Sequence, residues 1–483
     1  MPDRIIGVPI SQETACLCTV HHPGCILNSD FCILNFPLPL AIPPDYCYTI
    51  DNHTMKKDKR HMRTYPRLTV TEKAARKAKS GHPWVFGEEV LTMTMPDGTP
   101  VESIPMGDIA DVYSEKGKYL GSGFYNEHSK IRVRLVSTNT NDSFDSAFWT
   151  RRLSHAVAYR KTVMPGDFAS PTGGIRLIFG EADHFPGWTV DRYGSVLVSE
   201  VLSAGIHVRR DLLYPLLVEA CRAEGMEITA VYERCTGNLR RLEGLDEYDG
   251  YWNPAYFGLT EETCPREATL VENGVQYTVD FINGQKTGFF LDQKHNRRAA
   301  AGLARGKRVL DMFTHTGSFG LNCAAAGAAS VESVDISGEA VEMARHNAAI
   351  NGVSDTMTVI QADVFDMLRE LAEEKKNKGR WDYIILDPPA FTKSRDTVKS
   401  AYRGYKEINT LAMRLLPRGG YLATCSCSHF MPPDLFKRML HEAAEEAHVT
   451  LRQIEERAQA PDHPILWNVP ETEYLKFYLF QVE

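Results

Sequence analysis

Four acidic residues in the last third of the chain each follow a short apolar run, which gives them a spacing that suits a shared site. Asp311, Asp335, Asp363 and Asp387 are separated by intervals that each fit one strand followed by one helix. If the runs are parallel strands of one sheet, all four carboxylates lie along its carboxyl edge, where open α/β sheets bind ligands. A single Asp at a strand end is usually structural or caps a helix. Four in register favour a binding edge.

A nucleoside without phosphate groups is the ligand that this edge suits best. Gly317 and Gly320 let the backbone approach a ligand closely where a helix starts. Asp335 can accept hydrogen bonds from two ribose hydroxyls, and Asp363 lies where a carboxylate can meet an adenine amine. The phosphate-binding pattern G-x-G-x-x-G is absent. S-adenosylmethionine fits, because an acid-lined pocket also suits its sulfonium and ammonium charges.

Two cysteines bring a nucleophile to the same edge. Cys425 and Cys427 follow the apolar run that starts at Tyr421, a strand that lies close to the one ending at Asp387 in a doubly wound order. A thiolate can add to C6 of a pyrimidine and make C5 nucleophilic enough to accept a methyl group. An acid bonded at N3 would stabilise the adduct. A lone cysteine at a strand end more often serves only as a small apolar packing residue. These patterns do not choose between a nucleophile and a packing residue.

The elements that must position these groups alternate between strand and helix from residue 308 onward. The alternation predicts a doubly wound, mostly parallel sheet. Pro388 and Pro389 stop the strand at Asp387, because neither has an N–H to donate. The last two strands have little helix between them, which predicts a terminal hairpin with one antiparallel strand inside the sheet. The predicted strands are Val309–Phe313, Val331–Ile336, Met357–Ala362, Tyr383–Leu386, Tyr421–Cys425, Val449–Ile454 and Leu475–Val482.

The sequence before this sheet divides into three parts. Residues 1–62 lack periodicity and are interpreted as an atypical, disordered extension. Residues 66–140 contain short alternating runs separated by turn residues, which predicts a small β-barrel. Residues 145–265 predict a central α/β domain, with helices over 147–163 and Leu212–Arg222 and strands over Val196–Val201 and Ile228–Tyr232. Residues 270–483 carry the sheet, and Asn283-Gly284 predicts a hairpin turn near its start.

Basic residues gather in the small β domain. Lys77 belongs to a basic, helix-like stretch that precedes Gly81-His82-Pro83-Trp84, and Lys130, Arg132 and Arg134 share one strand face by period two. Basic side chains beside aromatic ones suit a nucleic-acid backbone. A solvated charged face explains the same pattern equally well.

Composition limits the remaining possibilities. The 483 residues are 43% hydrophobic with a net charge of −8, so any nucleic-acid surface is a local patch. No apolar run approaches the roughly 18 residues of a membrane helix. The 11 cysteines form no disulfide framework, which favours reduced thiols and a cytoplasmic location. Cys16, Cys18, His21, His22 and Cys25 do not match the usual zinc spacings, and metal binding there is the weaker alternative.

Residues 66–483 resemble the ribosomal RNA large subunit methyltransferase I family almost end to end. The motifs that carry the resemblance are Gly81-His-Pro-Trp-Val-Phe, Gly123-Phe-Tyr-Asn, Glu181-Ala-Asp, Val190-Asp-Arg-Tyr-Gly, Lys286-Thr-Gly-Phe-Phe-Leu-Asp-Gln, Phe313-Thr-His-Thr-Gly, Asp387-Pro-Pro-Ala-Phe, Arg403-Gly-Tyr-Lys-Glu-Ile-Asn, Ser426-Cys-Ser and Asp462-His-Pro. The resemblance implies a PUA domain, a central α/β domain and a Rossmann-like class I methyltransferase domain with a seven-stranded sheet. It also implies methylation of cytosine C5 in large-subunit (23S) ribosomal RNA.

The resemblance assigns roles to individual residues. Cys427 matches the family's nucleophile, Cys425 ranks second, and Asp387 holds the base edge. A homodimer is compatible with this assignment, and no metal is expected. The predicted cofactor contacts are Gln293, Asp311, Phe313, Thr314, Thr316, Gly317, Asp335, Ile336, Asp363, Val364 and Asp387. The predicted RNA contacts are Lys77, His82, Trp84, Arg132, Arg134, Arg403 and Lys406.

Two other functions stay open. Enzymes that methylate exocyclic amines use a similar Asp/Asn-Pro-Pro followed directly by an aromatic residue, whereas here Ala390 fills that position and Phe391 comes one later. A non-catalytic rRNA-binding assembly factor would not need four strand-end acids.

Overall fold

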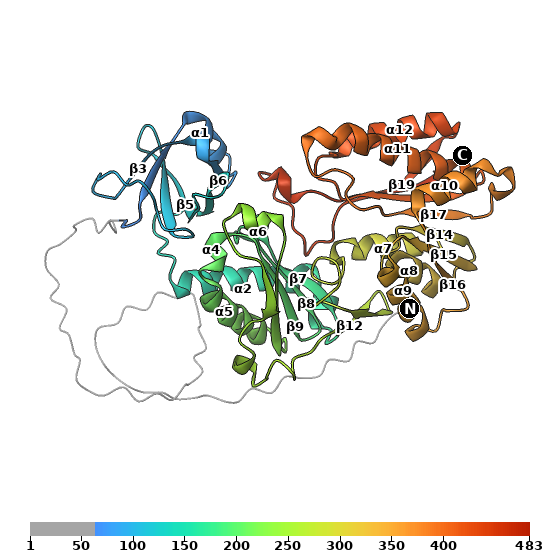
Figure 1. Ribbon diagram of the computed structural model, residues 1–483, viewed down its shortest axis with the longest axis horizontal. Coiled ribbons are helices and arrows are strands. Elements are labelled where there is room, and N and C mark those ends of the chain that lie inside the picture. Colours follow the sequence, from blue (N-terminus) through green and yellow to red (C-terminus); the bar gives the residue numbers. More distant parts are fainter. Residues whose placement is uncertain (1–62) are drawn as a thin grey trace, which may run out of the picture. The chain divides into compact units, whose positions relative to one another are not determined.

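The computed structural model describes residues 63–483 (Figure 1). The interpretation of residues 1–62 as an atypical extension, with its alternative of metal binding at Cys16–Cys25, lies outside the described residues. None of the described helices is long and apolar enough to cross a membrane.

The first described sheet occupies the predicted small β domain. It has six strands in the order β2-β6-β5-β4-β1-β3, and β1 and β4 form its parallel pair. Helix α1 begins at Glu72, where the Thr71 hydroxyl caps it by accepting from Ala74 N. The elements are β1 (Arg67–Val70), α1 (Glu72–Lys79), β2 (Trp84–Phe86), β3 (Val90–Thr94), β4 (Ile109–Ser114), β5 (Tyr119–Tyr125) and β6 (Ile131–Ser137).

A second, five-stranded sheet follows in the order β11-β10-β9-β8-β7. Helices α2 and α5 pack against each other and bury the same apolar cluster, which includes Trp149, Leu213 and Leu217. The elements are α2 (Ser146–Val163), α3 (Pro165–Ala169), β7 (Gly174–Phe179), η2 (Gly180–Asp183), β8 (Trp188–Tyr193), β9 (Val196–Val201), α4 (Ala204–His207), α5 (Arg210–Ala223), β10 (Ala230–Cys235), α6 (Asn238–Leu242) and β11 (Tyr248–Tyr251).

The third large sheet has seven strands in the order β16-β15-β14-β17-β18-β20-β19. Strand β20 runs antiparallel to both of its neighbours, and the other pairings are parallel, as the sequence pattern predicts. The strands are β14 (Arg308–Met312), β15 (Ser330–Asp335), β16 (Met357–Gln361), β17 (Tyr383–Leu386), β18 (Tyr421–Ser426), β19 (Leu451–Arg457) and β20 (Lys476–Val482).

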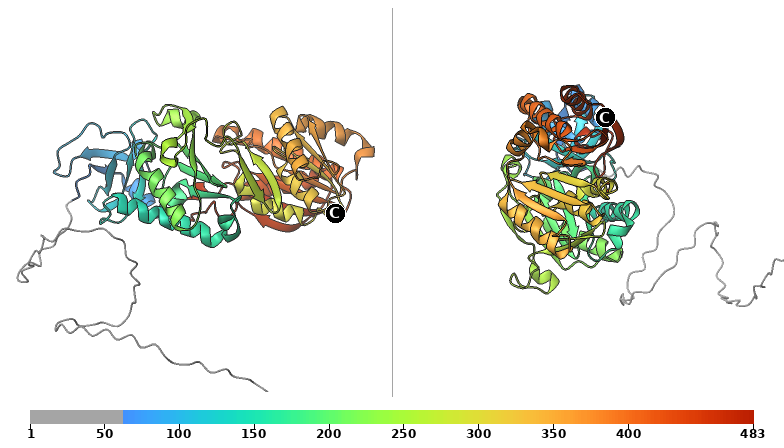
Figure 2. Two further views of the ribbon diagram at one scale, coloured as in Figure 1. Left: turned by 90° about the horizontal axis from the view of Figure 1, so that it is seen from below. Right: turned by 90° about the vertical axis from the view of Figure 1, so that its right-hand side faces the viewer.

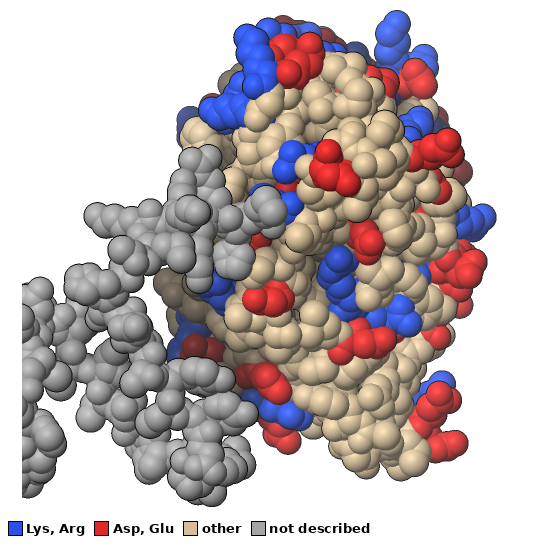
Figure 3. Space-filling view, turned by 90° about the vertical axis from the view of Figure 1, so that its left-hand side faces the viewer, with Lys and Arg blue, Asp and Glu red and all other residues tan. Residues whose placement is uncertain are grey.

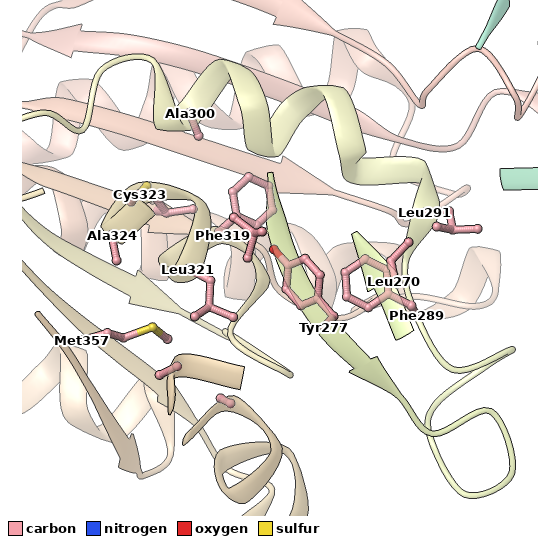
Figure 4. Packing of buried hydrophobic residues seen from close by; sticks show 14 of the residues in the cluster. Leu270, Tyr277, Phe289, Leu291, Ala300, Phe319, Leu321, Cys323, Ala324 and Met357 are labelled. Carbon is pink, nitrogen blue, oxygen red and sulfur yellow. The ribbon is translucent and has the colours of Figure 1, made fainter. Parts of the chain in front are cut away.

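Helices cover both faces of this sheet (Figures 1 and 2). Neighbouring residues of β17 show why both faces are needed, because Ile384 and Ile385 belong to different apolar clusters. One cluster packs the helices α7 and α8 and the hairpin of β12 (Ala268–Glu272) and β13 (Val275–Val279) against the sheet (Figure 4). The helices are α7 (Lys294–Ala301), α8 (Ser318–Ala325), α9 (Gly338–Ile350), α10 (Val364–Glu373), α11 (Val398–Leu415) and α12 (Pro433–Ala447).

The hairpin before this sheet turns at a different place from the one predicted. Strands β12 (Ala268–Glu272) and β13 (Val275–Val279) are joined by Asn273 and Gly274, which both have positive φ. The Asn283-Gly284 pair instead lies in a loop that the Asp280 carboxylate organises by accepting from the amides of Ile282 and Asn283. The prediction of a turn between strands at Asn283-Gly284 is therefore wrong.

Candidate active site

A cavity of about 310 Å³ opens at the carboxyl edge of the seven-stranded sheet. This volume is at the small end of the range for organic ligands. The residues that line the cavity are Gln285, Lys286, Phe290, Asp292, Gln293, Phe313, Thr314, His315, Ser318, Asp335, Ile336, Ser337, Asp363, Val364, Phe365, Asp387, Pro388, Pro389, Phe391, Cys427 and Leu475. Three of the four strand-end acids line it, and Asp311 does not.

Asp387 and Cys427 meet at one end of this cavity. Asp387 follows β17 directly, Cys427 follows β18, and the two strands pair in parallel. The Cys427 thiol contacts the carbonyl oxygen of Pro388 at 3.9 Å. Cys425, two residues earlier, is fully buried and belongs to the apolar cluster beneath the sheet. The structure therefore places Cys427, and not Cys425, on the cavity wall.

The Asp387 carboxyl is held in a fixed position by an amide. Gln293 Nε2 donates to Asp387 Oδ1 at 2.8 Å, and Asn296 Nδ2 donates to Gln293 Oε1 at 2.7 Å. Burial, with the nearby negative charge of Asp292 as a second cause, raises the pKa of Asp387 to about 7. A substantial fraction of this carboxyl is therefore protonated at neutral pH and able to donate a hydrogen bond.

The Cys427 thiol lies between groups of both signs. Burial raises its pKa to about 11, Lys286 opposes that rise, and Asp387 and Asp292 add to it. Behind the thiol, the buried Lys476 ammonium donates to the carbonyl oxygens of Ser428 at 2.7 Å and Tyr474 at 2.9 Å. Lys476 therefore fixes the backbone that follows the cysteine, and burial lowers its own pKa to about 8.

The opposite end of the cavity combines an acid with apolar side chains. The Asp335 carboxylate accepts from the backbone amides of His315 and Ser337, both at 2.9 Å. Ile336 lines the cavity yet is 64% exposed, so its apolar surface is open to a ligand. Burial lowers the pKa of His315 to about 4, which leaves this imidazole neutral beside Asp335. An exposed apolar surface next to a fixed carboxylate fits an adenosine.

Asp363 has a structural task besides facing the cavity. Its side chain caps helix α10 by accepting from Phe365 N at 2.8 Å and Asp366 N at 3.2 Å. Val364 and Phe365 line the cavity beside it. From the sequence, an acid at a strand end can be read either as a helix cap or as a ligand contact. In the structure Asp363 caps α10 and also lines the cavity.

Asp311 lies behind the loop that leads into α8 rather than in the cavity. It is fully buried and accepts from the Thr314 hydroxyl and from Gly320 N at 2.8 Å. A Cβ on Gly320 would lie 2.9 Å from Asp311 Oδ2, so this glycine is required by packing against the acid. Gly317, with φ of +86°, packs against α9 in the same way. The prediction that the two glycines admit a ligand stays a prediction beside this role in shaping the loop, and Thr316 and Gly317 are not among the residues that line the cavity.

Several lining residues were not predicted, and seven of them lie within the motifs that carry the family resemblance: Lys286, Phe290, Asp292, His315, Pro388, Pro389 and Phe391. Lys286, Phe290 and Asp292 belong to the Lys286–Gln293 motif, of which only Gln293 was predicted as a contact. Phe391 follows Asp387-Pro-Pro and packs against the Phe365 ring at 5.6 Å. Membership of such a motif is the signal that would have identified all seven.

The predicted RNA contacts are spread over several environments. Trp84 Nε1 donates to Glu181, and Arg134 forms ion pairs with Glu181 and Glu243, so these two side chains are committed to the central domain. On the face shown in Figure 3, basic and acidic side chains are interspersed and form no single basic patch.

Three further predicted RNA contacts also have acidic neighbours. Lys77 pairs with Glu89, Lys406 pairs with Glu446, and His82 lies 3.4 Å from Glu471. Arg132 and Arg403 have no carboxylate partner among residues 63–483. Within that range no cluster of His, Cys, Asp and Glu could hold a metal ion.

Comparison with known proteins assigns both the fold and the family. Residues 259–481 match the family model described as S-adenosylmethionine-dependent methyltransferase, and residues 68–138 match the PUA-like domain. A candidate SAM-dependent methyltransferase from Streptococcus mutans superimposes with a TM-score of 0.68 at 21% identity, over 86% of this chain and 99% of its own. A second solved methyltransferase, in complex with SAH, gives a TM-score of 0.70 at 20% identity over the same shares. The predicted PUA-like and methyltransferase folds are confirmed, and the chain is a SAM-dependent methyltransferase.

Curated relatives extend the match to nearly the whole described chain. The "Ribosomal RNA large subunit methyltransferase I" of Shewanella amazonensis is 41% identical over 397 residues, which are 82% of this chain and 94% of the relative. The protein of the same name from Alteromonas mediterranea is 38% identical over 402 residues, 83% of this chain and 95% of the relative. At this identity and coverage, the chain belongs to the ribosomal RNA large subunit methyltransferase I family.

Proposed function

We propose that this protein transfers a methyl group from S-adenosylmethionine to C5 of a cytosine in large-subunit ribosomal RNA, with Cys427 as the nucleophile. The observation that carries the proposal is that Cys427 and Asp387 line the same cavity, with the Cys427 thiol 3.9 Å from the carbonyl oxygen of Pro388, the residue after Asp387. The names of the curated relatives supply the class of substrate. A cytoplasmic location accords with a ribosomal substrate.

The cysteine makes the carbon reactive. The Cys427 thiolate forms a bond from Sγ to C6, and the electron pair of the C5–C6 double bond moves to C5, which then accepts the methyl group. S-adenosylmethionine supplies that methyl group in electrophilic form when bound. Loss of the C5 proton to water then returns its electron pair to the C5–C6 double bond and breaks the Sγ–C6 bond, which releases Cys427 as the thiolate.

Asp387 stabilises the charge that addition creates. Because its pKa lies at about 7, the carboxyl can donate a hydrogen bond to N3 of the ring while Gln293 keeps it oriented. Lys286 lowers the pKa of the thiol and so favours the nucleophilic thiolate. A cytosine must leave its stack to reach this enclosed site.

The cofactor binds at the other end of the cavity, where Asp335 and Ile336 lie. Asp335 receives the ribose hydroxyls, the exposed side chain of Ile336 covers the adenine, and Asp363 accepts from its amine. Gln293, Phe313, Thr314 and Val364 complete the contacts, since all four are buried or half-buried and line the cavity. Asp311, Thr316 and Gly317 act by shaping the loop that carries Phe313 and Thr314.

Replacement of the cysteine tests the reaction. We expect Cys427→Ala to abolish methyl transfer while S-adenosylmethionine binding, measured by calorimetry, stays unchanged. Cys221→Ala is the matched control, because this thiol is fully buried in the apolar cluster of the central domain, away from the cavity, and it should retain turnover. Mass spectrometry of nucleosides from treated ribosomal RNA should detect 5-methylcytosine only with an intact Cys427. Full activity of Cys427→Ala would contradict the C5 mechanism and favour methylation of an exocyclic amine.

A further inference from the structure

A second hollow, separate from the active cavity, has a volume of about 920 Å³. It is bordered by the PUA-like domain, helix α2, the turn η2 and the loop that joins β19 to β20. The active-site mechanism uses none of the side chains on its walls. The wall residues on which the argument rests are Arg151, Arg152, His155 and His184.

The acids on the walls of this hollow are already neutralised by protein cations. Asp183 is paired with the buried Arg160, and Asp142 accepts from Arg151 at 3.2 Å. Arg152, in contrast, donates to the carbonyl oxygen of Val136 and stacks on the Phe148 ring. No carboxylate among residues 63–483 forms an ion pair with it. The exposed imidazoles of His155 and His184 add hydrogen-bonding groups beside it. A wall with surplus positive charge attracts an anionic chain.

One tryptophan, Trp467, lies in the chain between two residues that line the hollow, although it is not itself a lining residue. Trp467 is 98% exposed, although both of its neighbours, Leu466 and Asn468, face the groove. An indole is rarely left in water, because it is large and apolar. This indole therefore has the surface needed to stack on a ligand.

The loop that displays Trp467 is tied down on both sides of it. Leu466 N donates to the Thr472 hydroxyl at 2.9 Å, and Val469 N donates to the Leu466 carbonyl oxygen at 2.9 Å. Asn468 Nδ2 donates to the carbonyl oxygen of Gly81 in the PUA-like domain at 2.6 Å. A ring held in this way loses little conformational freedom when a partner stacks on it.

The same segment also leads to the active cavity. Pro464, Ile465, Leu466 and Asn468 border the groove, and Leu475 lines the cavity. Between them, the Tyr474 hydroxyl donates to Asp292 Oδ2 at 2.6 Å, and Asp292 is itself a cavity residue. A chain lying in the groove would therefore reach the site of reaction over a short stretch of protein.

We propose that this groove binds a single-stranded stretch of the RNA substrate beside the target nucleotide, with a base stacked on Trp467 and a phosphate near Arg152. A basic groove combined with a rigid aromatic ring is the arrangement that holds single strands independently of sequence. The inference rests on the proposed RNA substrate and adds a second contact region to it.

Binding measurements on two variants test the inference. The full-length protein is titrated against a fluorescently labelled single-stranded RNA, and affinity is followed by anisotropy. Loss of one stacked base predicts that Trp467→Ala binds roughly 5- to 100-fold more weakly, and that Trp467→Phe recovers most of the affinity. Tyr256→Ala, an exposed aromatic outside the groove, is the matched control and should bind as the wild type does. Unchanged S-adenosylmethionine affinity confirms that the variants fold.

The salt dependence of binding examines the basic wall separately. Arg152→Gln should lower the slope of log affinity against log salt by roughly 0.7, the value for one phosphate that the protein no longer neutralises. If Trp467→Ala binds and methylates RNA as the wild type does, the groove is not the binding site, although the proposed function stands. If the wild type itself neither binds nor methylates RNA, the proposed function fails and the inference fails with it.

Discussion

Replacement of Asp387 by asparagine should change how stability depends on pH. Folding raises the pKa of this carboxyl from 3.8 to about 7, mainly through burial. The folded protein therefore keeps a proton that the unfolded chain releases above pH 3.8. This contribution to stability is fully present below pH 3.8 and is lost as the pH rises through about 7. Asparagine is neutral in both the folded and the unfolded state, so position 387 no longer makes the stability of the variant depend on pH.

The size of the effect follows from the linkage relation. Each pH unit between the two pKa values lowers the free energy of unfolding by about 1.4 kcal/mol. From pH 5 to pH 8 the loss for wild type amounts to about 2.5 kcal/mol. Asp387 faces the cavity, where water can reach it, so this figure is an upper bound. Between pH 5 and pH 8, the free energy of unfolding of Asp387→Asn should therefore rise relative to that of the wild type by up to this amount. The same variant should lose methyl transfer.

Urea unfolding of both proteins across this pH range measures the difference. Asp382→Asn is the matched control at the other end of β17, because its hydrogen bond with Arg308 holds the pKa of Asp382 below its usual value. Asp382 is ionised in both states throughout the range, so that variant should keep a constant difference from the wild type. A constant difference for Asp387→Asn as well would show that Asp387 is ionised in the folded protein, and would refute its role as a hydrogen-bond donor.

Three further changes have defined outcomes. Arg297→Met leaves the buried Glu272 without its cation and should lower the free energy of unfolding by about 3–5 kcal/mol in urea titrations, with part of the loss recovered when Glu272→Met is added. Gly320→Ala pushes a methyl group against Asp311 and should destabilise the protein by about 1–3 kcal/mol, with weaker cofactor binding in calorimetry. Asp335→Asn removes the charge proposed to receive the ribose and should weaken cofactor binding by roughly 10- to 100-fold; because it also leaves one of the amides of His315 and Ser337 without an acceptor, it should lower the free energy of unfolding by about 1–3 kcal/mol.

The sequence alone was sufficient for the sheet and for its reactive edge. Apolar runs that end in an acid, with the two prolines after Asp387, define strands locally, because burial and the lack of an N–H act on neighbouring residues. The lack of a helix pattern between the last two strands likewise predicted the terminal hairpin. The meeting of Asp387 and Cys427 followed from the parallel order of strands that such a pattern imposes.

Only the tertiary structure decided which way each side chain faces and what it pairs with. Asp311 ends its strand as Asp335 does, yet it turns inward to hold the loop before α8. Trp84 and Arg134 look like a nucleic-acid surface in the sequence, but Glu181 and Glu243, far along the chain, bind them. Trp467 has no sequence pattern that marks it as exposed. Long-range contacts fix burial and pairing, and no local pattern contains them.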